Sequence, residues 1–301
     1  MSEGTGRTIA LVGATGDLGG RILSALARRG VEVRALVRAA TPPARQDALR
    51  AAGATPLAVD FGDLDALTRA LGGAECVVSA LNGLEPTMIR LQGQVLDAAV
   101  AAGVPRFIPS DFSLDFTRTR PGDNRNMDLR RAFMARVDAA PIRATSILNG
   151  AFADLLTGEA PIVLHKLRRV LYWGDADQAF DFTTKDDVAD YTATAALDRE
   201  APRFLRIAGD VVSPRDLAAL MTRLDHQSWK PLRAGGLVRL SALIRIVRTL
   251  SPKSDAPFPA WQGMQYVRDM SSGRGKLMAL DNDRYGKTDW TRAEAVLGSA
   301  R

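Results

Sequence analysis

A glycine-rich segment near the beginning of the sequence constrains the fold more than any other feature. Gly13, Gly16 and Gly19 follow the short apolar run 8–12 and precede a stretch with the apolar spacing of a helix. Gly13 permits a tight turn, Gly16 lets the main chain approach a pyrophosphate, and Gly19 lets the helix pack closely on the strand. Free N–H groups at the start of such a helix bind anions. The segment therefore predicts a strand, turn and helix that bind a dinucleotide.

Apolar runs and helical stretches alternate through the first 150 residues. The expected strands occupy residues 8–12, 31–37, 55–59, 76–81, 106–109 and 145–148, and the expected helices occupy 21–29, 46–52, 86–102 and 126–137. Parallel strands need crossover connections, which place helices on both faces of the sheet. The pattern predicts an α/β fold with a doubly wound parallel Rossmann sheet, whose ligands bind beyond the carboxyl ends of the strands.

The residue at the end of the second expected strand indicates which dinucleotide binds. Sites specific for NAD usually have an acidic residue there, which accepts hydrogen bonds from the ribose hydroxyls. This chain has Arg38, whose guanidinium suits a 2′-phosphate, so the sequence predicts NADP(H) as cofactor. Arg34 and Arg45 are interpreted either as helpers at this phosphate or as surface charges.

The alternation loosens after residue 150, which indicates a second lobe. The predicted division is an NADP(H)-binding domain at 1–152, to which 180–215 returns, and a smaller, mostly C-terminal substrate lobe at 153–179 and 216–301. Trp261, Met264 and Tyr266 belong to an aromatic-rich part of this lobe. They are interpreted either as lobe core or as the lining of a pocket for a planar apolar molecule. We therefore expect a small-molecule substrate that is aromatic.

Composition argues against several other classes of protein. The net charge is +6, and the 34 arginines are spread along the chain without a run of five basic residues. No nucleic-acid partner is therefore expected. The basic apolar segment 237–250 is too charged to span a bilayer and is expected to be an amphipathic surface helix, with no membrane partner. The polar start at residues 1–7 predicts a cytoplasmic location. The sequence is compatible with a homo-oligomer.

Isolated residues of chemically active types have structural interpretations. Cys76 lies in an apolar strand and is expected to be a small buried hydrophobe. Neither His165 nor His226 has a partner at metal-ligand spacing, so no metal is assigned. Asp186 and Asp187 stand where a helix begins, which predicts capping.

These features together resemble the NmrA-like and isoflavone-reductase-like branch of the atypical short-chain dehydrogenases. The motifs that carry the resemblance are the glycine loop 13–19, Arg38, Gln92 on the helix after the fourth strand, and the segments 106–112 and 149–152. The resemblance implies cofactor contacts from Thr15, Asp17 and Leu18 on the pyrophosphate and from Arg38 on the 2′-phosphate.

Further along the cofactor, the resemblance places Ala80, Leu81 and Asn82 on the ribose side and Gln92 near the nicotinamide. It places a floor between nicotinamide and substrate at Pro109, Ser110, Asp111, Asn149 and Phe152. Asp60 and Asp63 are interpreted as helix caps and solvated groups in preference to adenine contacts.

The expected chemistry lacks the usual proton donor. Short-chain dehydrogenases use a Tyr-x-x-x-Lys pair, but no tyrosine here precedes a lysine at that spacing, and the first lysine is Lys166. Isoflavone-type reductases use a lysine on the helix after the fifth strand, where this chain has Asp128, Arg130 and Arg131. An arginine holds an oxyanion but does not shuttle protons near neutral pH. Asp111 and Arg130 are therefore the candidate catalytic residues.

Three functions follow, in order of preference. The first is an NADPH-dependent oxidoreductase that reduces a small aromatic or quinone-like substrate. The second is a non-catalytic NADP(H)-sensing regulator that binds a protein partner, and the third is a nucleotide-dependent lyase or isomerase. Fold alone does not rank them, because function depends on the site.

Overall fold

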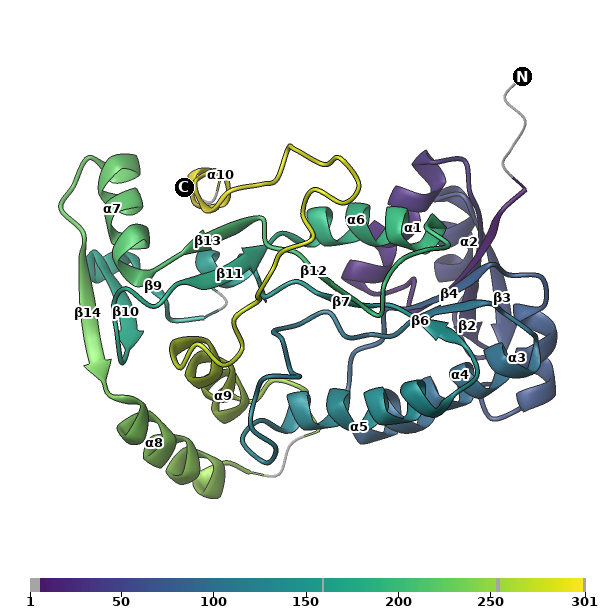
Figure 1. Ribbon diagram of the computed structural model, residues 1–301, viewed down its shortest axis with the longest axis horizontal. Helices are drawn as coiled ribbons and strands as arrows, with labels where there is room; N and C mark the ends of the chain where they lie inside the picture. The colour runs from purple at the N-terminus through teal and green to yellow at the C-terminus, as the bar shows by residue number, and fades with distance from the viewer. Residues whose placement is uncertain (1–5, 159, 253–254, 300–301) are drawn as a thin grey trace. The chain divides into compact units, whose positions relative to one another are not determined.

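The computed structural model describes residues 6–158, 160–252 and 255–299 and divides into two compact units (Figure 1). The first unit comprises the described residues up to Asp111 with Leu129–Ile147 and Val188–Leu205, and the second comprises Phe112–Asp128, Leu148–Asp187 and the described residues from Arg206 onward. The domain boundaries expected from the sequence remain predictions. Residues 1–5 of the polar start lie outside the described residues.

A six-stranded parallel sheet forms the centre of the first unit, with the strand order β3-β2-β1-β4-β5-β6. Its strands are β1 (Thr8–Val12), β2 (Glu32–Arg38), β3 (Ala54–Val59), β4 (Cys76–Ser79), β5 (Arg106–Ile108) and β6 (Arg143–Ala144). Val12 lies opposite both Leu36 on β2 and Ser79 on β4, so β1 and β4 end at the same level and β2 extends two residues further, to Arg38. The strand order reverses between β1 and β4, where ligands bind in folds of this kind. The predicted doubly wound α/β fold is confirmed.

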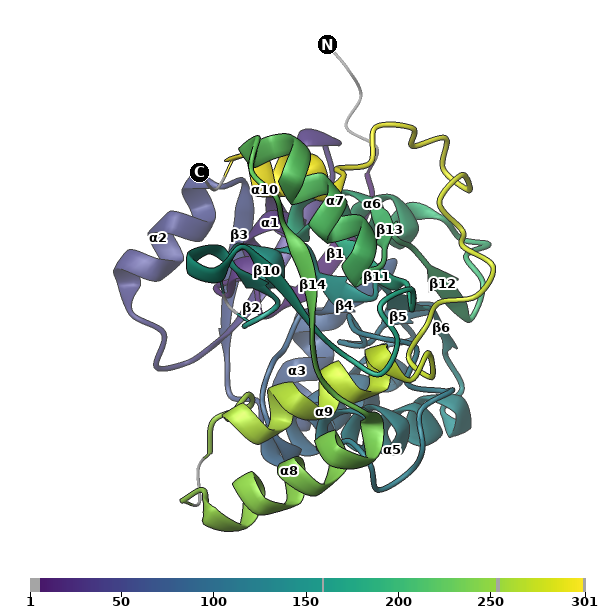
Figure 2. The same ribbon diagram turned by 90° about the vertical axis from the view of Figure 1, so that its left-hand side faces the viewer.

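Helices cover both faces of this sheet (Figures 1 and 2). On one face lie α1 (Asp17–Arg28) and α6 (Lys185–Leu197), joined by hydrogen bonds from Arg29 Nη2 to Asp190 Oδ1 (2.9 Å) and Thr194 Oγ1 (3.0 Å). On the other face lie α3 (Leu64–Leu71), α4 (Gln92–Ala101) and α5 (Arg125–Ala139), while α2 (Pro43–Ala51) connects β2 to β3.

The larger part of the first unit's core lies between the sheet and helices α3, α4 and α5. Apolar side chains of the strands and helices are fully buried there, among them Val12, Val77, Leu71, Leu96 and Phe133. The α3 helix keeps its apolar side chains on one face, which is the arrangement that burial against a sheet requires.

The second unit is built from small sheets and helices. Its sheets have the orders β14-β10-β9 and β13-β11-β8. A separate two-stranded sheet pairs β12 with β7, and most residues of these two strands belong to the first unit. The strands are β7 (Ser146–Leu148), β8 (Ala151–Phe152), β9 (Val163–Leu164), β10 (Arg169–Trp173), β11 (Phe180–Thr183), β12 (Phe204–Arg206), β13 (Asp210–Val212) and β14 (Lys230–Gly235). The helices are α7 (Pro214–Asp225), α8 (Leu237–Leu250), α9 (Ala260–Ser271) and α10 (Ala293–Ser299).

The segment 237–250 is a helix, as predicted. It forms α8, which packs along α9 (Figure 2), and it buries Leu240 and Ile244 while Val238 and Leu250 stay exposed. No helix in the described part of the chain is long and apolar enough to cross a membrane.

The prediction of a single sixth strand at 145–148 is wrong. The sixth strand of the sheet is β6, and β7 belongs to the two-stranded sheet with β12. The change of partner falls between adjacent residues, because Thr145 N donates to Phe107 O (3.0 Å) whereas Ser146 N donates to Arg203 O (2.8 Å). The chain therefore leaves the large sheet at Thr145.

The predicted helix 86–102 is present but begins with a different winding. Residues Pro86–Leu91 form a π-helical segment, η1, which passes directly into α4 at Gln92. π-helical turns are wider than α-helical ones and occur often at functional sites.

Candidate functional site

Two glycines of the phosphate loop are required by close packing of the main chain. Gly13 adopts φ +90°, and a Cβ atom on it would lie 2.5 Å from the carbonyl oxygen of Ala80. A Cβ on Gly19 would lie 2.1 Å from the carbonyl oxygen of Gly13. Contacts this short do not occur, so the turn after β1 and the seat of α1 both depend on glycine. This agrees with the roles expected for Gly13 and Gly19 in the turn.

Gly16 differs, because the protein itself leaves room for a side chain there. A Cβ on Gly16 would contact only Gly13 O, at 3.4 Å, and the residue is exposed. Gly16 is the N-cap of α1 in extended conformation, and no side chain caps this helix within the described residues. The first turn of α1 therefore begins without a side-chain cap, beside the exposed Thr15. A helix N-terminus without a side-chain cap is a favourable place for an anion.

The Asp17 carboxylate stands at this anion site, and its charge is partly offset. Arg21 Nε contacts Asp17 Oδ1 at 2.7 Å, one turn along α1. An acidic residue in the first turn favours the helix itself. Because the Asp17 side chain is negative, a bound phosphate would contact the backbone N–H of this residue and not its carboxylate.

Arg38 is exposed at the end of β2, and its guanidinium has no hydrogen bond or ion pair with any described residue. Arg34 is not free to help, because it binds Glu32 (3.2 Å) and the Gly72 carbonyl oxygen (2.7 Å). Arg45 is an exposed residue of α2. Of the three arginines considered for the 2′-phosphate, Arg34 is thus already engaged in contacts within the protein.

The carboxylates after β3 have the structural roles that were expected. Asp63 caps α3 by accepting from Ala66 N (2.9 Å), and Asp60 accepts from Gly62 N within the preceding turn (2.8 Å). Neither side chain needs a ligand to explain its position.

Ser110 joins the segments that follow β4 and β5. Its backbone N donates to Gln92 Oε1 (2.8 Å), and its hydroxyl donates to the Leu81 carbonyl oxygen. Gln92 is fully buried and also donates from Nε2 to Met88 O (3.1 Å), across the junction of η1 and α4. Both ends of the Gln92 amide therefore bind main chain. Ser110 and Gln92 together hold the loop that carries Pro109 against residues 80–82, of which Ala80 and Leu81 are half-buried and Asn82 is exposed.

Asp111 is buried in a polar network of the first unit. Its Oδ2 accepts from Ser146 Oγ (2.6 Å), and Ser146 Oγ accepts from Arg203 Nη1 (2.7 Å). Burial raises the pKa of the Asp111 carboxyl, an effect opposed by the Ser146 hydrogen bond and by the positive charges of Arg130 and Arg203. The two predicted catalytic residues thus interact electrostatically. A buried carboxyl with a raised pKa is a candidate for acid–base chemistry.

The remaining predicted site residues, Asn149 and Phe152, belong to the second unit. Asn149 is fully buried, its N donates to Ser113 O (3.0 Å) and its O accepts from Thr183 Oγ1 (2.7 Å). Its side-chain Nδ2 donates to Gly150 O, whereas its Oδ1 has no hydrogen-bond partner among the described residues. Phe152 is half-buried beneath Lys185, whose Nζ lies 6.0 Å from the ring centroid.

Sequence reasoning missed a buried ion pair beside this segment. Lys276 Nζ binds Asp181 Oδ1, and Asp181 Oδ2 accepts from Leu277 N (2.8 Å). The two partners are 95 residues apart in sequence. No local motif marks either of them; the only sequence signal is that the chain has six lysines, all after residue 165.

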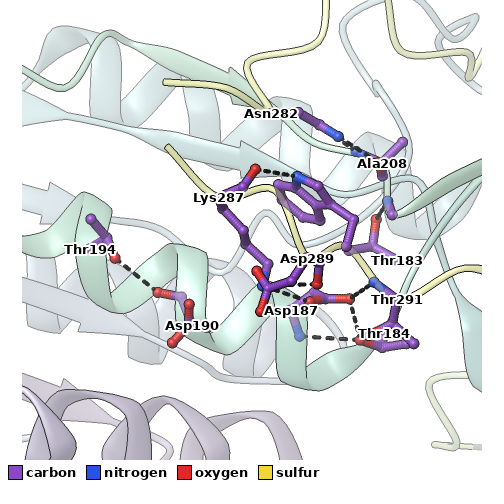
Figure 3. Close-up of polar contacts among 12 residues, drawn as sticks. Thr183, Thr184, Asp187, Asp190, Thr194, Ala208, Asn282, Lys287, Asp289 and Thr291 are labelled. Atoms are coloured by element: carbon purple, nitrogen blue, oxygen red, sulfur yellow. Dashed lines mark hydrogen bonds and ion pairs between the residues drawn. The ribbon is translucent and has the colours of Figure 1, made fainter. Parts of the chain in front are cut away.

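Other predicted structural residues are confirmed as structural. Figure 3 shows Lys287, Thr184 and Thr291 converging on Asp187, with Lys287 Nζ 3.1 Å from Asp187 Oδ1 and Thr291 N 3.0 Å from Asp187 Oδ2. Asp187 therefore holds the C-terminal segment at the start of α6. Cys76 is fully buried, and burial raises the pKa of its thiol to about 12.

His165 and Trp261 both pack against neighbouring side chains of the protein. His165 is exposed and packs edge to face on Trp229, with ring centroids 5.6 Å apart. Trp261 is buried, and the guanidinium groups of Arg125 and Arg248 lie 4.7 and 5.0 Å from its ring centroid. No cluster of three or more His, Cys, Asp or Glu side chains suited to a metal occurs in the described part of the chain.

The sheet order and the glycine loop define a Rossmann-type α/β protein. The model of the NmrA-like family matches residues 5–228, so the chain belongs to this family. The resemblance inferred from the motifs is confirmed.

The chain is similar to several plant reductases in sequence and in structure. The chain is 33% identical over 240 residues to an isoflavone reductase homolog IRL of Zea mays, a match covering 74% of this chain and 75% of that protein. It is 28% identical over 236 residues to a bifunctional pinoresinol-lariciresinol reductase of Linum perenne, covering 72% and 75%. The solved structure of AtPrR2 with NADP+ and (+)-pinoresinol superposes with a TM-score of 0.83 at 22% identity, covering 98% of this chain and 99% of that one, which shows a shared fold.

Proposed function

We propose that the protein is an NADPH-dependent reductase of a small aromatic or quinone-like molecule. The observation that carries this proposal is the uncapped N-terminus of α1 at Gly16 combined with the unpaired guanidinium of Arg38 at the end of β2. Gly16 lacks a side chain although packing would admit one, which is what a site for a pyrophosphate needs. Arg38 supplies the positive charge that a 2′-phosphate needs.

The residues of the first unit fit this cofactor. The backbone N–H groups at Asp17, Leu18 and Gly19 would hold the pyrophosphate, with Thr15 beside them. Ala80, Leu81 and Asn82 would line the ribose. NADPH supplies a hydride when bound. The Gln92 and Ser110 hydrogen bonds fix the loop formed by Pro109, Ser110 and Asp111. This loop would maintain the shape of the cofactor site.

The proposed substrate class follows from the relatives and from the second unit. The Zea mays and Linum perenne relatives are named as an isoflavone reductase homolog and a pinoresinol-lariciresinol reductase, and both names denote reductases of polycyclic phenolic compounds. Phe152 is half-buried in the second unit, which suits contact with a planar ring. These observations support an aromatic substrate without choosing among aromatic compounds.

The test measures binding and turnover separately. Fluorescence titration should give a dissociation constant for NADPH at least tenfold below that for NADH, equivalent to about 1.4 kcal/mol. NADPH oxidation is then followed with 1,4-naphthoquinone, other quinones and a panel of phenylpropanoids, and at least one compound should be reduced. Failure to bind NADPH would overturn the whole proposal.

A second candidate is a non-catalytic NADP(H) sensor. The observation that favours it is the composition of α5, which contains neither lysine nor tyrosine and places Arg130 and Arg131 where a proton donor is expected. Tight NADPH binding, no turnover with any member of the panel, and a protein partner captured only in the presence of NADPH would favour the sensor.

A further inference from the structure

A cavity of about 430 Å³ lies in the first unit, at the edge of the large sheet. It is lined on one side by residues of 137–144, which run from the end of α5 into β6, and on the other by residues 200–203, which precede β12. Sites for small molecules commonly occupy about 300–1,000 Å³. The lining contains none of the residues predicted to contact the cofactor, all of which lie in the described part of the chain. The cavity is therefore a different site.

The cavity lies where two segments of the chain diverge. Ser146 N donates to Arg203 O (2.8 Å), where β7 pairs with β12. Before this point the chain runs in β6, which ends the strand order of the large sheet. Arg143 N and Thr145 N both donate to main-chain oxygens at β5, so the main-chain groups of Ala144 between them point the other way. The N–H and C=O of this residue therefore face the side of segment 200–203.

The walls of the cavity are largely apolar. Ala140, Ala144 and Ala201 contribute methyl groups, and Ile142 and Pro202 contribute larger apolar surfaces. Sites for small molecules combine walls of this kind with a few polar groups that fix the orientation of the ligand. The volume and the walls therefore suit a short aliphatic group.

The charged groups at this cavity balance one another. The lining includes two arginines and two carboxylates, Arg143, Arg203, Asp138 and Glu200. Arg143 meets Glu200 through two parallel contacts of 3.4 Å, from Nη1 to Oε1 and from Nη2 to Oε2, and these side chains are 56% and 81% exposed. An ion pair this exposed contributes little to stability. A ligand that carries both charges can therefore take its place at little cost.

Arg203, by contrast, is held in place by the protein. Its Nε donates to Asp138 Oδ1 (2.8 Å), its Nη1 donates to Ser146 Oγ (2.7 Å), and its guanidinium lies 4.5 Å from the ring centroid of Phe204. Its side chain is 28% exposed. Arg203 is therefore a fixed wall of the cavity, whereas Arg143 is the arginine that can change partner.

We propose that this cavity binds an aliphatic α-amino acid as a zwitterion, with its carboxylate on Arg143 and its ammonium on Glu200. The two charges of an α-amino acid are borne on one carbon, which matches the adjacent positions of these two side chains. A guanidinium suits a carboxylate in particular, because its donors match both oxygens. The aliphatic group lies against Ala140, Ile142 and Pro202. A ligand with only one charge would leave Arg143 or Glu200 without a partner, so the amino acid is favoured over a simple acid or amine.

Three related ligands test this assignment by isothermal titration calorimetry on the full chain. L-Leucine should bind. Its analogue 4-methylpentanoate lacks the ammonium, and isopentylamine lacks the carboxylate. Each should bind about fivefold more weakly than L-leucine, because each loses one of the two ion pairs.

Two variants separate the charge contacts. In Arg143→Gln, L-leucine should lose its advantage over isopentylamine, and in Glu200→Gln it should lose its advantage over 4-methylpentanoate. Both side chains are exposed, so the unfolding midpoints should stay as in wild type. Arg199→Gln and Glu75→Gln are the matched controls, because they break an arginine–glutamate pair (3.3 Å) that does not line the cavity. Both controls should keep the selectivity of wild type.

A steric variant tests the position of the ligand without changing a charge. Ala140→Leu enlarges a side chain of the cavity lining and should weaken L-leucine binding about tenfold, while the NADPH dissociation constant stays as in wild type.

Three results would overturn the proposal. The first is that L-leucine does not bind to wild type. The second is that 4-methylpentanoate or isopentylamine binds as tightly as L-leucine, which would show that the two charges are not both recognised. The third is that Arg143→Gln and Glu200→Gln keep the selectivity of wild type, which would place the amino acid elsewhere on the protein. Because the L-leucine titrations contain no NADPH, their outcome does not depend on the reductase function.

Discussion

A Cβ atom on Gly19 would lie 2.1 Å from the carbonyl oxygen of Gly13, whereas one on Gly16 would contact that same oxygen at 3.4 Å. Gly19 within α1 and Gly16 at its N-cap are therefore glycine for different reasons. Gly19 is required by the contact between helix and turn. Gly16 is not required by any packing contact. The absence of a side chain there leaves space for a ligand at the start of the helix.

This difference predicts opposite phenotypes for two alanine variants. Gly19→Ala should lower the free energy of unfolding by more than about 2 kcal/mol, because main-chain atoms cannot move aside cheaply. Gly16→Ala should fold with an almost unchanged unfolding midpoint and bind NADPH at least tenfold more weakly. Thermal unfolding and fluorescence titration measure the two effects.

Gly20→Ala is the matched control on the same helix. A Cβ there would lie 3.6 Å from Ala14 O, an ordinary contact. Alanine should stabilise α1 by about 0.5–1 kcal/mol and leave NADPH affinity unchanged. If Gly16→Ala bound NADPH as wild type does, the anion site at α1 would lose its main support.

Arg38 is predicted to distinguish NADPH from NADH. Arg38→Gln removes a guanidinium that has no partner among the described residues, so the fold should not change. The NADPH dissociation constant should rise at least tenfold, about 1.4 kcal/mol, while that of NADH stays constant. Arg38→Asp should weaken NADPH further through repulsion of the phosphate.

Two neighbouring arginines serve as comparisons in the same titration. Arg50→Gln, which loses only a surface pair with Asp47, should have no effect on either cofactor. Arg45→Gln decides whether that exposed residue of α2 assists Arg38. An equal loss of NADH and NADPH affinity in Arg38→Gln would contradict recognition of the 2′-phosphate.

Gln92 is predicted to stabilise the loop after β5. Gln92→Met keeps the side chain's length but leaves Ser110 N without its acceptor and Met88 O without its donor. An unsatisfied buried polar group costs about 1–3 kcal/mol, so the unfolding midpoint should fall by several degrees, and NADPH binding should weaken. Gln94→Met, at an exposed position of α4, controls for the substitution itself. Equal midpoints for the two variants would show that the Gln92 amide is dispensable.

The parts of the structure that could be predicted from sequence are those set by neighbouring residues. The turn at Gly13, the helix start at Gly16 and the cap at Asp63 depend on a few consecutive residues, and all three are present. The alternation of strands and helices likewise follows from the period of the apolar residues. These local rules were sufficient for the fold class.

The parts that could not be predicted depend on partners far along the chain. Thr145 and Ser146 are adjacent, yet one binds Phe107 and the other Arg203, so the end of the sheet is decided by residues about 40 and 60 positions away. Lys276 and Asp181 meet across 95 residues in the same way. No short stretch of sequence around either residue indicates this ion pair.

The buried carboxyl of Asp111 leads to a prediction about pH. Burial raises its pKa above the usual 3.8, so the folded protein binds this proton more tightly than the unfolded chain does. Folding stability is therefore favoured below the raised pKa and decreases as the pH rises from about 3.8 through it, by about 1.4 kcal/mol for each pH unit of difference. Asp111→Asn cannot ionise and should lack this decrease.

The measurement is the unfolding free energy in urea from pH 4 to pH 8 for wild type and Asp111→Asn. The difference between the two proteins should change in favour of Asp111→Asn as the pH rises, because only wild type must ionise a buried group. Asp47→Asn, at an exposed carboxylate of α2, should follow wild type at every pH. Parallel curves for Asp111→Asn and wild type would mean that Asp111 ionises as freely as in the unfolded chain.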